Sequence, residues 1–585
     1  MTSPPGVLDL IRGAANPHGA RAAALYLLRG DATAGPIIEI ISTEGVELPA
    51  RSGPPSHPAR LTLLHFNDFH GRLAIFPRLA AWLAATRDRY AADPHHAVLA
   101  VTAGDESGGN LSDALLGRDP ASCQAHPGYR LYSQAGVDLG LLGNHDLDLD
   151  TPLLAHVIGR ETRFPILAAN VTGSPALAAS ICPAAIFISK GLRIGFIGLT
   201  TPAQVRPEPE SGRRVTDPVA AAQHLIPALR PLCDILIILS HLGLSLNQRS
   251  AVVSQAGDVE LAASLPPGAV HLIVGGHTHN SLNEAGLGPQ NIVNGIPIVQ
   301  AGKFGQFAGE VEISVGETVE VTHAGLRATV DLPDDEAFAR THVQPLLAQI
   351  ETHRRRILGA IAPDEDLSAD AVRNRFATGE SAFANFITDA LVRQCRAAGH
   401  PVDFAMIDAT SINDGLRPRE TLTLGDWFGV MPFADTVCLL RLTGREIAAL
   451  LADNARRIER PGEPHTNRGF LHFSAGVRYA IRLGPARPAA AVSAITLDGQ
   501  PLAACLERVF LLATTSFVRG PAAAWEAYAG AHFPEPLFDL AAVPRVHTPL
   551  SVRDLLFDHI TTHGGILRAG GARRDGRVLA ASPLL

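Results

Sequence analysis

Residues 61–71 read LTLLHFNDFHG, an apolar run of strand length that ends in two polar residues, Asp68 and His70. Four later apolar runs end in the same way, with carboxylate, imidazole or carboxamide side chains where the chain leaves the strand. These end groups are Asp105, then Asn144, His145 and Asp146, then His241, and finally His277 and His279. Helical stretches rich in Ala and Leu lie between the runs, and this alternation predicts a layered α/β domain.

The side chains at the ends of these strands predict a metal site. In open α/β sheets, ligands bind at the carboxyl ends of the strands. Two neighbouring divalent cations repel each other, so a bridging carboxylate such as that of Asp105 is needed between them. Nitrogen and oxygen ligands without sulfur favour Zn, Mn, Fe or Co over Ca or Mg. A single histidine at a strand end is usually a hydrogen-bonded turn residue, but the recurrence at five strands favours the metal interpretation.

The composition excludes several classes of protein. The chain has 585 residues, of which 46% are hydrophobic and 18% charged, so global disorder is excluded and more than one domain is expected. The formal net charge of −8 argues against binding a nucleic-acid polymer or an anionic membrane through a basic field. No apolar run reaches the ~18–20 residues of a membrane helix, and the N-terminus lacks the order of a signal peptide, so we expect a cytoplasmic protein. The sequence indicates no oligomeric state.

The chain is expected to contain four parts. Residues 1–58 form an N-terminal extension of unknown role, within which residues 36–48 could pair as strands. Residues 59–333 form the α/β domain, and residues 334–361 predict one long amphipathic helix, acidic at its start and basic at its end as the helix dipole prefers. Residues 362–585 form a second globular domain. The six cysteines are scattered without a CxxC pair, so we expect buried thiols.

The motifs resemble those of a known family. The series D-F-H, G-D, G-N-H-D, S-H and G-G-H-T-H resembles the calcineurin-like metallophosphoesterases. LGNHDLDLD at residues 142–150 and IGFIGLTTP at 194–202 are similar to segments of the 5′-nucleotidase family, which includes UDP-sugar hydrolases and 2′,3′-cyclic nucleotide phosphodiesterases. Residues 421–447 and 469–481 resemble its C-terminal domain. The resemblance implies a four-layer α/β metallophosphoesterase sandwich domain, a connecting helix and an α/β C-terminal substrate-binding domain.

The resemblance also implies roles for individual residues. One metal ion would be held by Asp68, His70, Asp105 and His279, and the other by Asp105, Asn144, His241 and His277. His145 and Asp148 match the family's catalytic pair, in which the aspartate orients the imidazole, although an H-x-x-D pattern could also cap a helix. The implied chemistry is in-line attack on phosphorus by a hydroxide that the two metals generate from water.

The resemblance is weaker where the substrate would bind. Phe433 and Phe517 match the aromatic pair that sandwiches the base, and Asp435 and Asn413 match polar substrate contacts. The family's N-G-G-x-I-R is replaced here by DATSIN at residues 408–413, and its G-G-D-G-Y by PAAAW at 521–525. We therefore expect a metal-dependent phosphoester hydrolase that releases phosphate from nucleotides. The alternatives are a phosphatase or phosphodiesterase with a cyclic or non-nucleotide substrate, and a binding or regulatory protein that keeps its metals without turnover.

Overall fold

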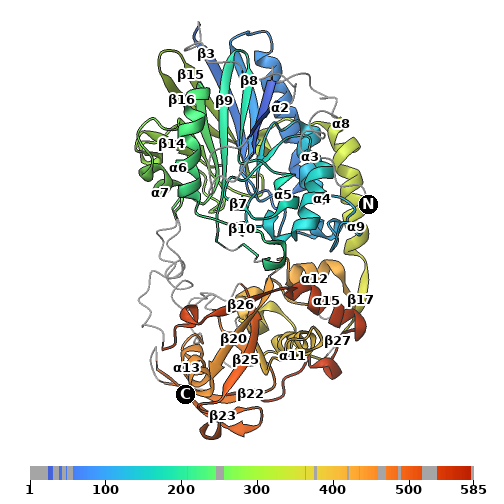
Figure 1. The fold of residues 1–585 in the computed structure, drawn as a ribbon. Coiled ribbons are helices and arrows are strands. Elements are labelled where there is room, and N and C mark those ends of the chain that lie inside the picture. The colour runs from blue at the N-terminus through green and yellow to red at the C-terminus, as the bar shows by residue number, and fades with distance from the viewer. Residues whose placement is uncertain are drawn as a thin grey trace. The chain divides into compact units, whose positions relative to one another are not determined.

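The computed structural model describes most of the chain. The described residues are 24–29, 39–42, 48 and 57–581, apart from 204, 207, 246–255, 363, 374–378, 418–419, 434, 459–468, 485–488 and 517–536. They fall into two compact units, one extending to Glu351 and the other starting at Thr352 (Figure 1). Among these residues, no helix is both long and apolar enough to cross a membrane. All six cysteines are buried thiols that form no disulfide, as expected.

Two sheets form the centre of the first unit. The larger has eight strands in the order β13 (Ile292–Val293), β14 (Ile296–Val299), β12 (Leu272–Val274), β11 (Ile235–His241), β9 (Leu192–Thr200), β8 (Ala184–Ser189), β1 (Ala24–Arg29) and β2 (Glu39–Ser42). The smaller has four, in the order β16 (Val319–Ala328), β15 (Phe307–Val315), β3 (Ala59–Phe66) and β4 (His96–Thr102). Strands β9, β11, β12 and β14 run parallel, as do β3 and β4.

The two sheets pack face to face, and helices cover their outer faces (Figure 1). Leu61 and Val311 of the smaller sheet share one buried core with Ile237 of the larger sheet. On the other face of the larger sheet, Ile238 packs in a core with α6 (Pro218–Leu229) and α7 (Asp258–Ser264). Helix α2 (Phe76–Tyr90) lies against β4, beside α3 (Pro127–Ala135). The expected four-layer α/β domain is confirmed.

The N-terminal segment differs from the expectation of a separate extension. Strand β1 pairs antiparallel with β8, and β2 pairs with β1, so both belong to the larger sheet. The side chains of Leu25, Leu27 and Leu28 are buried on β1. A strand with apolar side chains on both faces needs cover on both. Here β8 pairs with one edge of β1, and the cores on the two sides of the larger sheet cover its faces.

The expected linker helix ends earlier than the sequence indicated. The helical segment consists of α8 (Glu336–Phe338), a π-helical turn (Ala339–Val343) and α9 (Gln344–Arg354). The next residues form strand β17 (Ile357–Ile361), which pairs with β19 (Thr421–Thr423) and β27 (Gly565–Ile566). Leu358 and Ile361 are buried while Ile357 is exposed. Burial of these two side chains between paired strands overrides the helical charge pattern.

The second unit is also α/β, as expected. Its main sheet has the strand order β21 (Leu471–Phe473), β18 (Phe404–Asp408), β25 (Val509–Thr515), β20 (Thr436–Thr443) and β26 (Arg545–Ser551). A second sheet contains β24 (Gln500–Pro501), β23 (Ala490–Leu497), β22 (Val477–Leu483) and β28 (Val578–Ala581). The longer helices are α11 (Ala382–Ala397), α12 (Leu424–Val430), α13 (Gly444–Ala455) and α15 (Val552–Thr562).

Candidate metal centre

The backbone at the predicted metal ligands is strained. Five of the seven residues lie in the left-handed region: Asp68 at φ 54°, His70 at 47°, Asp105 at 58°, His277 at 77° and His279 at 60°. Residues with a Cβ avoid this region, and each such placement costs about 1–3 kcal/mol. Strain of this kind persists only where the surrounding structure enforces it, and it gathers at functional sites.

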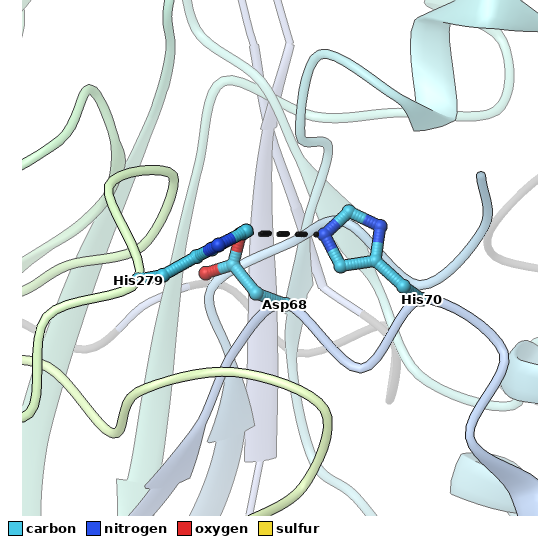
Figure 2. A group of neighbouring side chains, drawn as sticks. All are labelled: Asp68, His70 and His279. Carbon is cyan, nitrogen blue, oxygen red and sulfur yellow. Dashed lines mark hydrogen bonds and ion pairs between the residues drawn. The ribbon is translucent and has the colours of Figure 1, made fainter. Parts of the chain in front are cut away.

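Asp68, His70 and His279 form the first group of candidate ligands. Figure 2 shows the two imidazoles facing each other beside the carboxylate. The Nε2 atoms of His70 and His279 are 3.4 Å apart, and Asp68 Oδ1 lies 3.3 Å from His279 Nε2 and 3.9 Å from His70 Nε2. Two ring nitrogens and a carboxylate oxygen that converge in this way suit a shared cation.

Asp105, His241 and His277 form the second group, with Asn144 beside it. Asp105 Oδ2 lies 3.1 Å from His241 Nε2, and Asn144 Oδ1 lies 2.8 Å from His277 Nδ1. Within the described part of the chain, His241 Nε2 is buried and makes no contact of hydrogen-bond geometry, its close neighbour being the Asp105 carboxylate. An orphaned ring nitrogen directed at a carboxylate fits a metal ligand, because a buried polar atom left without a partner is otherwise destabilising.

Asp105 connects the two groups. Its Oδ2 atom is 3.9 Å from His70 Nε2 of the first group, in addition to its contact with His241. Conversely, Asp68 Oδ1 lies 3.9 Å from His241 Nε2. The donor set is therefore one cluster of nitrogen and oxygen atoms with a shared carboxylate, which is the arrangement that two adjacent divalent ions require.

Hydrogen bonds outside the cluster orient its histidines. His241 Nδ1 lies 2.6 Å from the Ala103 carbonyl oxygen, and His70 Nδ1 lies 3.2 Å from that of Gly108. A carbonyl only accepts, so each Nδ1 donates to it. This contact directs each Nε2 into the cluster, where the neutral ring can bind a metal.

Asp146 joins two of the loops that carry ligands. Its carboxylate accepts hydrogen bonds from the backbone N–H groups of Asp105 (3.0 Å), Glu106 (3.1 Å), Ser107 (3.3 Å) and Gly143 (2.9 Å), and from the Ser107 hydroxyl (3.2 Å). The loop after β4 is thereby fixed to the loop after β5 (Gly140–Leu141). Sequence reasoning noted Asp146 as an end group and assigned it no role; its place after the Asn-His pair was the available signal.

His145 and Asp148 form a pair at the edge of the cluster. His145 Nδ1 lies 2.9 Å from Asp148 Oδ2, and the His145 ring lies 5.4 Å from the ring of His70. Burial lowers the pKa of His145, but the charge of Asp105 and the hydrogen bond to Asp148 outweigh it and raise the pKa to about 10. His145 stands at the N-cap of a short 3-10 helix (Asp146–Asp148), but its side chain makes no capping hydrogen bond there, and α4 (Thr151–Glu161) is capped by Asp150.

Two arginines that sequence reasoning missed hold the backbone around Asp148. Arg213 is buried and donates hydrogen bonds to the carbonyl oxygens of Leu147 (2.8 Å) and Leu149 (2.9 Å), on either side of Asp148. Arg206 donates to the carbonyl oxygen of Asp148 itself, at 2.9 Å. Both arginines lie more than fifty residues further along the chain, and no local pattern marks them.

The predicted substrate residues lie in the second unit. Phe433 follows α12 and is 43% exposed. Asn413 donates its backbone N–H to the carbonyl oxygen of Val430, the last residue of that helix, at 2.8 Å. Asp435 Oδ1 accepts a hydrogen bond from the Ser516 hydroxyl at 3.4 Å. Asn413, Phe433 and Asp435 therefore gather near the end of α12, and Phe517 lies outside the described residues.

Comparisons with known proteins match both units. Residues 61–281 match the model of calcineurin-like phosphoesterases, and residues 359–529 match that of the 5′-nucleotidase C-terminal domain. A 5′-nucleotidase of Vibrio cholerae is 27% identical over 437 residues, covering 68% of this chain and 76% of that protein. Protein UshA of Yersinia enterocolitica is 25% identical, covering 67% of this chain and 76% of its own length.

Solved structures share the fold. The NAD nucleotidase of Haemophilus influenzae superposes with a TM-score of 0.56 at 18% identity, covering 89% of this chain and 99% of that chain. A 5′-nucleotidase precursor of Thermus thermophilus superposes with a TM-score of 0.50 at 24% identity and the same coverage. The calcineurin-like fold implies divalent metal ions, and the two ligand groups provide a place for them. The chain is therefore a phosphoester hydrolase of the 5′-nucleotidase type, with a calcineurin-like metallophosphoesterase domain and a 5′-nucleotidase C-terminal domain.

Proposed function

We propose that this protein releases phosphate from nucleotides with the help of two divalent ions, of Zn, Mn, Co or Fe. The ions would be held by the seven residues Asp68, His70, Asp105, Asn144, His241, His277 and His279. The observation that carries the proposal is the single cluster in which Asp105 reaches both ligand groups while the His145–Asp148 pair lies at its edge.

The residues of the cluster have separable tasks. Two bound ions would lower the pKa of a water molecule and neutralise charge on the phosphoryl group. His145 would donate a hydrogen bond to the phosphoryl or leaving-group oxygen as negative charge develops there. Asp148 holds the imidazole in place through Nδ1, which leaves Nε2 for this contact. The backbone N–H of His145 donates to Asp105 Oδ1 at 2.9 Å, so the catalytic imidazole and the bridging carboxylate keep a constant spacing.

Nucleotides are favoured as substrates by two observations. The relatives in Vibrio, Haemophilus and Thermus carry nucleotidase names. The exposed ring of Phe433 provides a face on which a base can stack, a contact worth about 1–3 kcal/mol.

A cyclic or non-nucleotide phosphoester is the second candidate. It is favoured by the changed segment at residues 408–413, in which Asp408 is buried and accepts the Thr410 N–H at 2.8 Å, so this carboxylate stabilises a turn. A metal-keeping protein without turnover is disfavoured, because a structural metal site has no need of the His145–Asp148 pair.

A substrate panel tests the proposal. The protein is stripped with a chelator, reloaded with Mn, Co or Zn, and assayed with nucleoside monophosphates, cyclic nucleotides, sugar nucleotides and p-nitrophenyl phosphate. We expect chelation to abolish hydrolysis, the metals to restore it, and nucleoside monophosphates to give the highest kcat/KM. Activity that survives exhaustive chelation with no metal detected would refute the metal mechanism. Hydrolysis of the aryl or cyclic substrates alone would favour the second candidate, and metal-loaded protein without any activity would favour the binding protein.

A further inference from the structure

Two cations lie over one aromatic ring beside the metal cluster. The Arg72 guanidinium carbon is 4.9 Å from the centre of the Phe304 ring, and the Lys303 ammonium nitrogen is 5.1 Å from it. We call Arg72, Lys303 and Phe304 the cationic rim. Within the described part of the chain, no carboxylate lies within ion-pair distance of either cationic group. Lys303 is one of only two lysines among 49 basic residues.

The rim is attached directly to the first ligand group. The Phe304 ring centre is 5.6 Å from that of His70 and 6.0 Å from that of His279. The Phe304 N–H donates to the Asp68 carbonyl oxygen at 2.7 Å. Phe304 has a φ of 56°, a conformation that is rare for a bulky side chain and typical of functional sites. Its ring is thus held in place by the loop that carries Asp68 and His70.

The rim borders the open side of the cluster. The Asp68 and His241 side chains are fully buried, whereas 31% of the His279 side chain and 23% of the His145 side chain are exposed. A substrate therefore approaches over His279 and His145, and Phe304 packs against His279. Arg72 is exposed, so its cationic group can meet an anion there with little desolvation.

We propose that Arg72 and Lys303 bind a second phosphate of the substrate, adjoining the phosphoryl group that reacts. This inference rests on the proposed function, since the metal cluster is what positions the first phosphate. An aromatic ring attracts cations without neutralising them, so both retain full charge for an anion. Arg binds phosphate oxygens in a bidentate fork and Lys acts as a point charge, a pairing suited to a diphosphate. The favoured substrate class is nucleoside diphosphates and other molecules with two linked phosphates.

Calorimetry on the metal-loaded protein tests the rim without relying on turnover. The probes are methylenediphosphonate, which carries two linked anionic groups, and inorganic phosphate, which carries one. In the Arg72→Met/Lys303→Met variant, we expect the ratio of the Kd for methylenediphosphonate to the Kd for phosphate to rise about tenfold or more, the scale of a lost charge-assisted contact. The Lys303→Arg variant should keep most of the wild-type preference for methylenediphosphonate. In the same variants, kcat/KM for ADP is compared with kcat/KM for p-nitrophenyl phosphate.

Matched controls separate the rim from general charge effects. Lys190→Met removes the other lysine, whose ammonium group donates to the Ala91 carbonyl, and Arg89→Met removes a cation that lies 5.8 Å from the Tyr90 ring. Both should leave the diphosphonate-to-phosphate ratio unchanged. If the Arg72→Met/Lys303→Met variant loses affinity equally for both probes, or for neither, the inference is overturned. Wild-type protein that hydrolyses p-nitrophenyl phosphate without preferring methylenediphosphonate overturns it as well, while the proposed function stands. If the metal-loaded wild-type protein hydrolyses no substrate, the inference and the proposed function are both refuted.

Discussion

A single methyl group added at Gly143 should disrupt the metal cluster. An alanine Cβ at this position would lie 2.1 Å from Asp105 Oδ1, 2.5 Å from Asp105 N and 2.7 Å from Asp105 Cγ. The Gly143 backbone lies outside the left-handed region, so alanine brings no conformational strain of its own. The effect of Gly143→Ala is therefore steric and directed at the carboxylate that joins the two ligand groups.

The size of the effect can be worked out from these distances. Carbon and oxygen atoms rarely approach closer than about 3 Å, so the carboxylate or the loop has to move by about 1 Å. Metal ligands tolerate deviations of only about 0.2 Å, and a misplacement of about 1 Å can cost about 100-fold in rate. The Gly143 N–H also donates to Asp146 at 2.9 Å, and this bond has to move too. We expect kcat/KM to fall at least about 100-fold and the metal content to fall with it.

Gly316→Ala is the matched control. Gly316 lies in the turn between β15 and β16, and a Cβ there meets no atom within 4 Å. Both variants are assayed for metal content by mass spectrometry, for kcat/KM on p-nitrophenyl phosphate, and for the midpoint of thermal unfolding. Gly316→Ala should match the wild type in all three. Wild-type metal content and activity in Gly143→Ala would refute the assignment of Asp105 as the shared ligand.

Three further substitutions test the surrounding residues. His145→Ala should keep the metal content and lower turnover about 100-fold, since a positioned proton donor is lost; an equal loss of metal would make His145 a ligand. Phe433→Ala should raise KM for nucleotides and not for p-nitrophenyl phosphate, shifting the ratio of the two efficiencies about 5- to 150-fold; a parallel fall for both would identify Phe433 as part of the core. Arg213→Met frees the carbonyl oxygens on either side of Asp148 and should lower kcat about tenfold with metal retained. In a His145→Ala background, Arg213→Met should lower kcat no further. The control Arg214→Met, at an exposed neighbouring residue, should leave kcat unchanged. If the losses in kcat from His145→Ala and Arg213→Met add, Arg213 acts on stability alone.

The ligand positions were accessible from sequence because they obey a local rule. A strand such as residues 61–66 is recognisable by its apolar run, and the polar residues just beyond it, Asp68 and His70, are carried to the sheet edge. Parallel strands bring their carboxyl ends to the same edge, so motifs far apart in the chain, such as those at His241 and His277, were expected to converge. The α/β class of both units came from the same alternation of strands and helices.

Tertiary packing alone decided the contacts between residues without a shared pattern. The strand Ala24–Arg29 could have paired anywhere, and only the free edge of β8 made it part of the larger sheet. The helical charge pattern of residues 334–361 gave way to a strand at Ile357 because its apolar residues found partner strands. Arg213 and Phe304 reach the site through backbone carbonyl groups, which every residue carries. A hydrogen bond to a carbonyl leaves no side-chain signature at its acceptor, so only the folded structure reveals it.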